Sequence, residues 1–433
     1  MKQTGIRVAM IGVGQLGLAC AEVMAEQYEV EGFDPASVAP SNFRMVASLE
    51  DACTGKDIIF VAVPTPHEVA YGGESPSAHL PPKNFGYSIV TSVLEEINAY
   101  TRSHQLVTLI STILPGTTRR EIIPLVRNYR FVYNPYLIAG GSVKWDMVNP
   151  EMIIVGTEDG STTGAAAQLL AFYAPLMRNN PRIVVGTWDE AESIKIFYNT
   201  FISAKLGIVN MIQDVAERVG NINVDVVTDA LKHSSRRIMG PGYMTAGMGD
   251  GGACHPRDNI ALRWLAQDIG LGYDLFEAII ASRESQAAHI ARRLLLLAEE
   301  HDLRDIWIHG KSYKPGVSST AGSYSLLIAD YLRVAGRRVG FVDPLTSDCH
   351  DAVYGVVLLA HQAAVTYSHF PSTHAQQFYC VIQPGSVVVD PWRQVTGSMV
   401  PGCTVVHYGN TRKAGSSQIR FNIHAADRDP RND

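Results

Sequence analysis

A glycine-rich turn between an apolar run and a helical segment constrains the fold of this chain most strongly. The run Arg7–Ile11 is typical of a buried strand, and residues 18–27 have helical composition. In such a turn one glycine permits a tight bend, a second lets backbone approach a pyrophosphate, and a third lets the helix pack against the sheet. The helix N-terminus adds N–H groups and partial positive charge. The pattern predicts a dinucleotide site formed by Gly12, Val13, Gly14, Gln15, Leu16 and Gly17.

An acidic residue follows the second predicted strand at the spacing expected for such a site. Tyr28–Phe33 is the strand, and Asp34 ends it. A carboxylate there accepts hydrogen bonds from the adenosine ribose and disfavours a 2′-phosphate. The predicted cofactor is therefore NAD rather than NADP. A plain structural turn is the alternative to dinucleotide binding.

Strand-like runs alternate with helical segments through the first third of the chain. Three further apolar runs, 57–63, 107–110 and 152–155, each stop at a turn or polar residue. Strands separated by helices predict an α/β fold with a parallel, doubly wound sheet.

The later sequence predicts a helical middle and a second α/β region. A long amphipathic helix is expected over 191–219, a Gly-rich break over 240–252, and helix over 259–300. Strand-helix-strand patterns return at 306–308, 323–335 and 339–343. We expect two Rossmann-like domains joined by a central helical domain. The predicted parts are an NAD-binding Rossmann domain (1–190), a central helical domain (191–300), a second α/β domain (301–412) and a polar tail (413–433).

Composition excludes several other classes of protein. The 433 residues are 46% hydrophobic and carry a net charge of −6, which argues against general binding to nucleic acid or anionic membrane. No apolar run reaches the roughly 18 residues of a membrane span. The six cysteines have no metal-type spacing and form no dense disulfide framework. We expect a soluble cytoplasmic protein without a metal.

Two polar groupings in the helical middle point to chemistry. Lys195 and Asn199 are four residues apart on one helix face, where they can stabilise an alkoxide or a bound water. Cys254 lies in a Gly-rich segment with Asp258 four residues on, an arrangement open to a nucleophilic thiol. A solvated helix face and a buried apolar cysteine are the respective alternatives.

The chain resembles the UDP-glucose/GDP-mannose (nucleotide-sugar) 6-dehydrogenase family over nearly its whole length. The family's motifs occur here in the family's order. They are the glycine turn, Val63-Pro64-Thr65-Pro66, Ser111-Thr112, Pro115-Gly116-Thr117-Thr118, Asn134-Pro135, Asp146 with Asn149-Pro150, Ala191-Glu192-x-x-Lys195-x-x-x-Asn199, Cys254 to Asp258, Tyr313-Lys314-Pro315 and Val342-Asp343-Pro344.

This resemblance implies NAD-dependent oxidation of a sugar C6 alcohol to a carboxylate in two steps. Cys254 would capture the aldehyde as a thiohemiacetal, later oxidised to a thioester that water hydrolyses. Lys195 and Asn199 would hold the oxyanion. Asp258 would act with Lys195 and an ordered water in proton transfer, and Thr112 would help to position that water. The implied cofactor contacts also include Pro64, Thr65 and Thr112, and the implied substrate contacts are Lys195, Asn199, Tyr243, Gly251 and Lys314. The resemblance also implies that 191–300 is the dimerisation and catalytic domain, with the long helix as its dimer-forming element, and that 301–412 binds the nucleotide sugar. A homodimer or higher homo-oligomer is therefore expected.

Four positions in three segments depart from the family pattern. Tyr136 and Gly140 replace two glutamates, the second of which serves acid/base chemistry in the thioester half-reaction. Ala321 replaces a cofactor-contacting arginine, and Arg257 replaces the lysine before the catalytic aspartate. Asp250 is a candidate for the missing carboxylate by proximity in sequence.

Three alternatives stay open. The missing glutamates allow an enzyme that stops at the aldehyde or thioester, and together with the missing arginine they allow a non-catalytic homologue. A β-hydroxyacid-dehydrogenase-type oxidoreductase also pairs an N-terminal Rossmann domain with a Lys-x-x-x-Asn helix, and it does not require Cys254. A UDP-sugar is the expected substrate of the leading interpretation.

Overall fold

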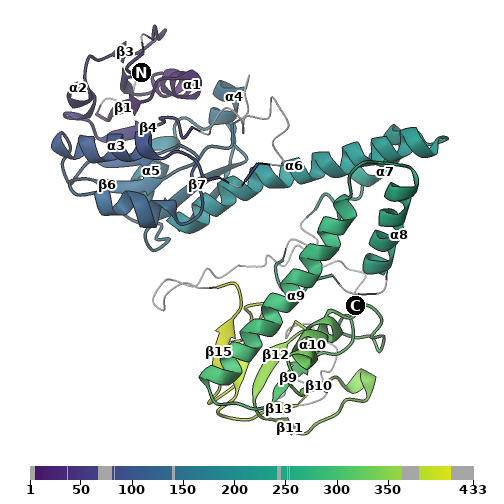
Figure 1. Cartoon of the computed structure of the whole chain (residues 1–433). Helices are drawn as coiled ribbons and strands as arrows, with labels where there is room; N and C mark the ends of the chain where they lie inside the picture. The colour runs from purple at the N-terminus through teal and green to yellow at the C-terminus, as the bar shows by residue number, and fades with distance from the viewer. Residues whose placement is uncertain are drawn as a thin grey trace. The chain divides into compact units, whose positions relative to one another are not determined.

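The computed structural model describes residues 5–36, 38–66, 80–81, 83–138, 142–240, 245–250, 252, 254–362 and 380–410. The chain divides into two compact units, the first running to Ala204 and the second starting at Lys205 (Figure 1). The boundary falls inside the long helix α6 (Trp188–Val219). The predicted domain boundaries therefore stay a prediction, as does the polar tail over 413–433, which lies outside the described residues.

The first unit contains an eight-stranded sheet of order β3-β2-β1-β4-β5-β6-β7-β8. All neighbouring strands are parallel except β6 and β7, which pair antiparallel. The strands are β1 (Arg7–Ile11), β2 (Glu29–Phe33), β3 (Arg44–Met45), β4 (Ile58–Val61), β5 (Leu106–Leu109), β6 (Arg130–Tyr133), β7 (Met152–Thr157) and β8 (Arg182–Thr187). The first six strands have the order of a dinucleotide-binding Rossmann sheet. The predicted doubly wound fold is confirmed.

Helices cover both faces of this sheet because its strands are apolar on both sides. One core is formed with α1 (Gln15–Met24), α4 (Val143–Val148) and α5 (Ala165–Tyr173). The other is formed with α2 (Leu49–Cys53), α3 (Ser88–Glu96) and the start of α6. Strands β1, β4 and β5 are almost wholly buried between the two layers. The carboxyl ends of these three strands therefore meet at one edge of the sheet, where ligands of such folds bind.

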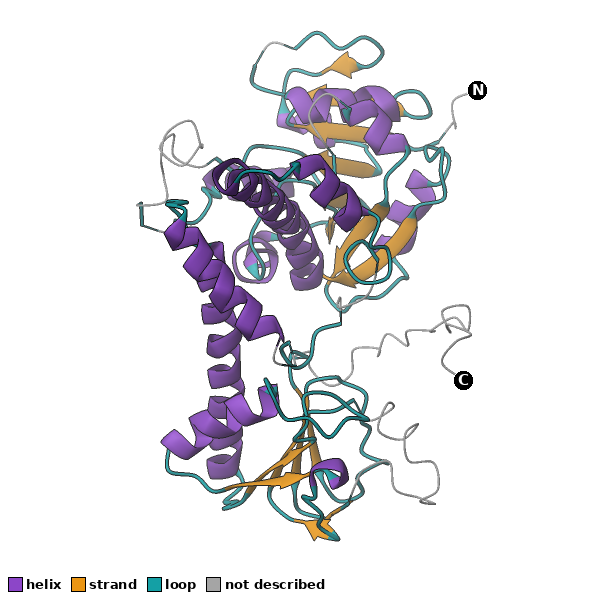
Figure 2. Cartoon of the chain, turned by 90° about the vertical axis from the view of Figure 1, so that its right-hand side faces the viewer, coloured by secondary structure: helices purple, strands orange, loops and turns teal. Residues whose placement is uncertain are grey.

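The second unit joins helices to a parallel five-stranded sheet of order β10-β9-β12-β14-β15 (Figure 2). Its helices are α7 (Val224–Lys232), α8 (Cys254–Asp268), α9 (Leu275–Glu300) and α10 (Tyr324–Val334). Its strands are β9 (Ile306–His309), β10 (Val339–Val342), β12 (Val356–Leu359), β14 (Val387–Asp390) and β15 (Thr404–His407), with a small pair of β11 (Ala352–Val353) and β13 (Val381–Ile382). Helices α9 and α10 pack against one face of the sheet. The predicted second α/β region is therefore confirmed.

The helical middle differs from the expected continuous helix over 259–300. Helix α8 begins at Cys254. Pro256 lies in its first turn, where a missing backbone N–H is tolerated. The helix then stops, because Gly270 and Gly272 have φ of +61° and +83°. Asp274 accepts a hydrogen bond from the Glu277 N–H and caps the start of α9.

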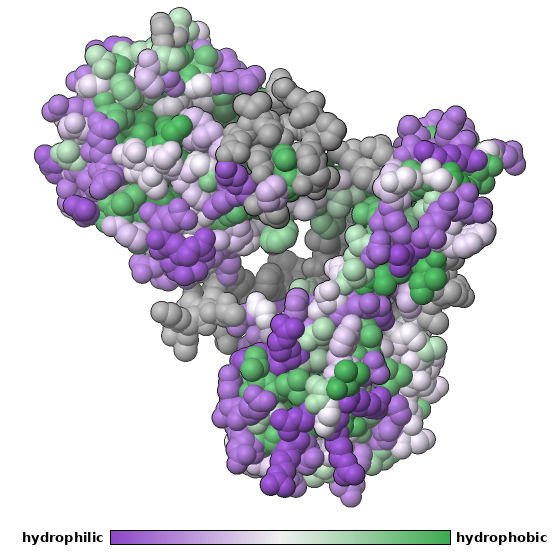
Figure 3. Space-filling view, in the orientation of Figure 1, coloured by the Kyte–Doolittle hydropathy of each residue, from purple (hydrophilic) through white to green (hydrophobic). Residues whose placement is uncertain are grey.

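Large apolar side chains reach the surface along the helical segment, as the face drawn in Figure 3 shows. On α6, Phe197 and Phe201 are 64% and 56% exposed. On α8, Trp264 and Ile260 are 64% and 59% exposed. Side chains this large are rarely left in water together unless a surface is used for binding.

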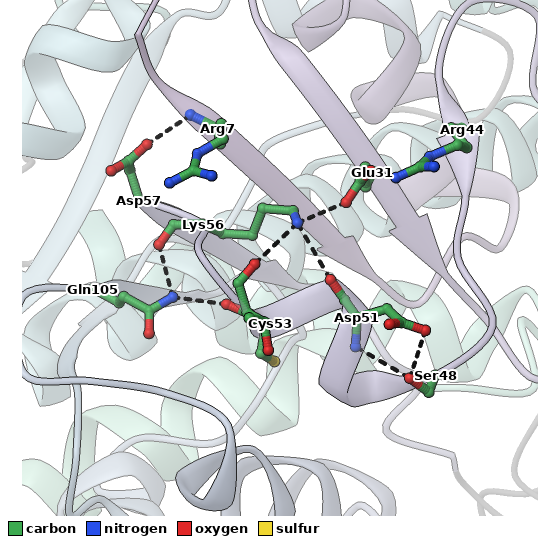
Figure 4. Close-up of polar contacts among 10 residues, drawn as sticks. Arg7, Glu31, Arg44, Ser48, Asp51, Cys53, Lys56, Asp57 and Gln105 are labelled. Atoms are coloured by element: carbon green, nitrogen blue, oxygen red, sulfur yellow. Dashed lines mark hydrogen bonds and ion pairs between the residues drawn. The ribbon is translucent and has the colours of Figure 1, made fainter.

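A buried ion pair between Lys56 and Glu31 ties β2 to the loop after α2 (Figure 4). The Lys56 Nζ lies 2.6 Å from a carboxylate oxygen of Glu31 and donates to the Asp51 carbonyl at 3.2 Å. Arg44 contacts the other Glu31 oxygen. Burial raises the pKa of Glu31, but Lys56 and Arg44 outweigh it and hold that pKa below its ordinary value. The pair therefore stays charged inside the fold.

Candidate functional site

The glycine turn lies after β1, at the point where the strand order reverses between β1 and β4. Gly12 has φ of +89°, and a Cβ there would lie 2.8 Å from the Ala62 carbonyl carbon. A Cβ on Gly17 would lie 2.0 Å from the Gly12 carbonyl oxygen, so α1 needs a glycine to approach the turn. A Cβ on Gly14 would meet nothing within 4 Å. The first and third glycines are thus required by packing, whereas the second faces open space suited to a phosphate.

Asp34 closes this turn from the end of β2. Its carboxylate accepts hydrogen bonds from the Val13 N–H at 2.8 Å and the Ala36 N–H at 2.9 Å. Each carboxylate oxygen has a further acceptor site, which suits the two hydroxyls of a ribose. The open space at Gly14 and this carboxylate fit NAD, as the sequence predicts.

A cleft of about 210 Å³ lies at the carboxyl ends of β4 and β5. Its lining includes Lys195 and four of the predicted cofactor contacts, namely Leu16, Pro64, Thr65 and Thr112. The lining residues are Leu16, Ala62, Val63, Pro64, Thr65, Ile110, Ser111, Thr112, Tyr136, Ile138 and Lys195. Ligands of open α/β sheets bind at this edge. Gln15, also predicted, lies exposed at the first position of α1.

Hydrogen bonds fix the two strand-end loops that line the cleft. The Thr65 hydroxyl donates to the Thr112 carbonyl at 2.8 Å. The Ser111 hydroxyl donates to the Val63 carbonyl at 2.5 Å. The Thr112 backbone therefore joins the two loops, and the residue lines the cleft.

Lys195 enters the cleft from the second turn of α6. It is 9% exposed, and its Nζ donates to the Tyr136 carbonyl at 2.7 Å. Burial lowers the pKa of Lys195 from its ordinary value. Asn199, one turn further along α6, is exposed, so the two predicted partners share a helix face but differ in burial.

Glu192 has a structural role that the sequence analysis did not assign. It is fully buried and accepts hydrogen bonds from the Gly116 N–H at 2.5 Å and the Thr118 N–H at 2.7 Å. Burial raises its pKa above the ordinary value. Glu192 thus ties α6 to the Gly116–Thr118 turn, three residues before Lys195. The sequence signal that could have indicated this role is an acidic residue at an apolar position of the predicted helix.

Tyr136, at a position where the family resemblance implies a glutamate, has a buried phenol hydroxyl. Its hydroxyl lies 2.6 Å from the Tyr173 hydroxyl, and Tyr173 donates to the Asn134 side-chain oxygen at 2.5 Å. Burial raises the pKa of Tyr136 well above the ordinary value, so the phenol stays neutral. No carboxylate is therefore present at this position. Gly140, the other replaced glutamate, lies outside the described residues.

The predicted thiol belongs to the second unit. Cys254 and Asp258 occupy the first and second turns of α8, where a four-residue spacing places them on one helix face. The structure describes the backbone of these two residues and not their side chains. Tyr243 and Gly251, predicted substrate contacts, lie outside the described residues.

A loop after β9 presents the remaining predicted substrate contact. Lys314 is exposed, and its ammonium lies 5.5 Å from the Tyr313 ring centre. Asp343, fully buried at the end of β10, accepts hydrogen bonds from the Lys311 and Ser312 N–H groups at 3.0 and 2.8 Å. Asp343 therefore fixes this loop, a role that its motif position alone did not reveal.

Within the described ranges, no helix is long and apolar enough to cross a membrane. Nor do the described residues contain a group of three or more His, Cys, Asp or Glu arranged to hold a metal ion.

Two family models match the chain. Residues 35–177 match the NAD binding domain of the UDP-glucose/GDP-mannose dehydrogenase family, and residues 189–284 match its central domain. The first model supports NAD as the cofactor of the glycine turn.

Curated relatives agree with these models. A UDP-glucose 6-dehydrogenase of Bacillus subtilis is 28% identical over 318 residues, covering 71% of this chain and 63% of the relative. A UDP-glucose 6-dehydrogenase of Rhizobium meliloti is 26% identical over 373 residues, covering 78% of this chain and 82% of the relative. The match thus spans less than two thirds of the Bacillus protein.

A solved structure shows the same fold. A GDP-mannose dehydrogenase from Pseudomonas aeruginosa superposes with a TM-score of 0.73 at 19% identity, covering 92% of this chain and 99% of that one.

Proposed function

The chain belongs to the UDP-glucose/GDP-mannose dehydrogenase family, and on this basis we propose that it is an NAD-dependent nucleotide-sugar 6-dehydrogenase. It oxidises the C6 alcohol of a UDP-sugar resembling UDP-glucose to the uronic acid. The observation that carries the proposal is the cleft beside the glycine turn, into which the buried Lys195 projects. Four residues that are predicted to contact the dinucleotide thus line the same cleft as a lysine side chain.

The residues of the first unit suit the cofactor part of this reaction. NAD, when bound, supplies the hydride acceptor for both oxidations. The open face of Gly14 and the N-terminus of α1 would hold its pyrophosphate, and Asp34 would hold its ribose. Pro64, Thr65 and Thr112 border the cleft beside this position.

Lys195 is suited to stabilise a developing oxyanion. An ammonium has three N–H donors, and the Tyr136 carbonyl accepts from one of them. The fixed position in a partly desolvated cleft strengthens its interaction with negative charge. Burial lowers its pKa below the ordinary lysine value, so it releases a proton more readily than an exposed lysine does. Asn199 adds an amide donor one turn away, and Thr112 positions a water.

Cys254 provides the nucleophile of the proposal. Its thiolate adds to the aldehyde carbon, and the new C–S bond breaks when water attacks the later thioester, which releases the acid and restores the thiol. Asp258, on the same helix face, takes part in proton transfer through water. Lys314 binds the diphosphate of the substrate.

The exposed apolar side chains of α6 favour a homodimer formed through this helix. Phe197 and Phe201 lie four residues apart and so line one helix face. Burial of the two side chains in an interface would contribute favourably to association. Sedimentation velocity tests this point: a dimer is expected, and a monomer at micromolar concentration would contradict it.

A substrate panel tests the proposed function. The protein is incubated with NAD and each of several UDP- and GDP-sugars, and NADH is followed by absorbance. We expect turnover with a UDP-hexose and none with Cys254→Ser beyond a single oxidation. Unchanged turnover in Cys254→Ser would favour a β-hydroxyacid-dehydrogenase type of chemistry instead. Absence of turnover across the panel would favour a non-catalytic homologue.

A further inference from the structure

The loop that leads to Cys254 is packed against aromatic side chains of the same unit. A Cβ on Gly247 would lie 2.2 Å from the Trp392 ring, and a Cβ on Gly249 would lie 2.2 Å from the Tyr324 ring. The Ala246 carbonyl accepts a hydrogen bond from Arg393 at 2.7 Å. The loop backbone thus lies directly on the α/β part of the second unit, where only glycine fits.

Asp250 anchors the same loop by charge. Its carboxylate accepts a hydrogen bond from the Arg283 Nε of α9 at 2.5 Å, and both side chains are partly buried. Its other oxygen lies 3.9 Å from the His255 Nδ1. Asp250 is therefore engaged by an arginine, which makes it a poor replacement for the family's missing catalytic glutamate.

Arg283 is itself held in place from α10. Its guanidinium carbon lies 5.2 Å from the centre of the Tyr324 ring. The Tyr324 hydroxyl donates to the Arg283 carbonyl at 2.8 Å and contacts Gln286 at 2.7 Å. One tyrosine thus packs on both the arginine and Gly249, so the loop and the ion pair share a support.

The loop also contacts the segment that contains Lys314. A Cβ on Gly252 would lie 3.4 Å from the Tyr313 ring, an ordinary van der Waals distance. Tyr313 immediately precedes Lys314. The backbone just before Cys254 and the predicted diphosphate-binding residue are therefore neighbours within one unit.

We propose that Asp250 and Arg283 are positioning residues that fix the backbone carrying the Cys254 thiol, an inference that rests on the proposed function. Glycine-rich backbone loses more conformational freedom on ordering than any other, so this loop needs an external constraint. The charged hydrogen bond between the two residues supplies it, and it is stronger than a neutral one. Correct placement of a nucleophile contributes mainly to kcat.

Three variants test the proposal. Asp250→Asn removes the charge at constant size, Arg283→Gln removes the cation, and Arg283→Lys retains it. The matched control is Arg293→Gln, which breaks an exposed ion pair with Glu300 on the same helix. We expect kcat with the UDP-sugar to fall about tenfold or more in the first two variants, with KM within about twofold, because small misplacements cost up to about 100-fold. Arg283→Lys is expected to retain more activity, and the control to match wild type.

Hydrogen exchange gives a measurement that does not depend on turnover. Amides of the peptide spanning residues 245–254 are expected to exchange about tenfold faster in Asp250→Asn and Arg283→Gln, while the C-terminal half of α9 exchanges as in wild type. A KM effect without a kcat effect, or unchanged exchange in this peptide, would overturn the proposal. If wild type oxidises no nucleotide sugar, the proposed function fails while the exchange measurement still decides the positioning role.

Discussion

Alanine substitutions at the first two glycines of the turn are predicted to affect different properties: Gly12→Ala lowers the stability of the fold, and Gly14→Ala weakens NAD binding. In Gly12→Ala the new methyl would lie 2.8 Å from both the carbonyl carbon and the oxygen of Ala62, and φ is +89°. Left-handed backbone costs a non-glycine residue about 1–2 kcal/mol. Overpacking against backbone adds about 1–3 kcal/mol. The expected loss of unfolding free energy is therefore about 2–5 kcal/mol.

Gly14→Ala is the matched control for fold stability. Gly14 has φ of −72° and extended backbone, which alanine adopts without strain, and its Cβ would meet nothing within 4 Å. The expected stability change is within about 0.5 kcal/mol. The methyl would instead occupy the space proposed for the pyrophosphate. We expect the Kd for NAD to rise about tenfold or more, which corresponds to about 1.4 kcal/mol.

Calorimetry measures both effects. Differential scanning calorimetry should show a Tm lower by roughly 4 to 20 °C for Gly12→Ala, using about 2–4 °C per kcal/mol for a unit of this size. Gly14→Ala should unfold near the wild-type temperature, and isothermal titration should show weakened NAD binding. Wild-type affinity for NAD in Gly14→Ala would refute the cofactor assignment, and a wild-type Tm in Gly12→Ala would refute the packing argument.

Three further predictions concern buried polar groups. Lys56→Met should lower the unfolding free energy by about 1–3 kcal/mol in urea titrations, because Glu31 would lose its buried partner and keep only the contact with the exposed Arg44; a loss under about 0.5 kcal/mol would count against this. Burial lowers the pKa of His309 from 6.5 to about 3, so the unfolded chain takes up a proton that the folded chain refuses. Stability should fall by up to about 1.4 kcal/mol per unit as pH drops through this window, and less steeply in His309→Gln. Tyr136→Phe removes the hydrogen bond to Tyr173 and should lower the unfolding free energy by about 1 kcal/mol. A Tm equal to that of wild type would contradict this.

The sequence predicted those elements whose signals are local. Gly12, Gly14 and Gly17 have fixed spacing, and strand, turn and helix follow each other without a gap, so the first βαβ unit was found within a few residues. Helix α1 begins at Gln15, three residues before the predicted start, because the turn residues themselves enter the helix. The periodic pattern of α6 was equally clear, since no proline interrupts it.

Long-range contacts were beyond sequence reasoning. The partners of Glu192 lie more than 70 residues away in the Gly116–Thr118 turn, and no periodic pattern joins them. The antiparallel pairing of β6 with β7 depends on sheet position rather than on composition. The ion pair of Asp250 with Arg283 is another example, since sequence proximity had pointed to catalysis instead.

The central claim is a two-stage oxidation that passes through a thiol ester, and counting NADH per sugar consumed tests it most directly. The purified protein is given a limiting amount of the UDP-hexose that it turns over, with excess NAD, and product mass is measured alongside absorbance. The account predicts two NADH for each sugar and a uronic acid as product. One NADH for each sugar, with an aldehyde released or a sugar retained on Cys254, would contradict it.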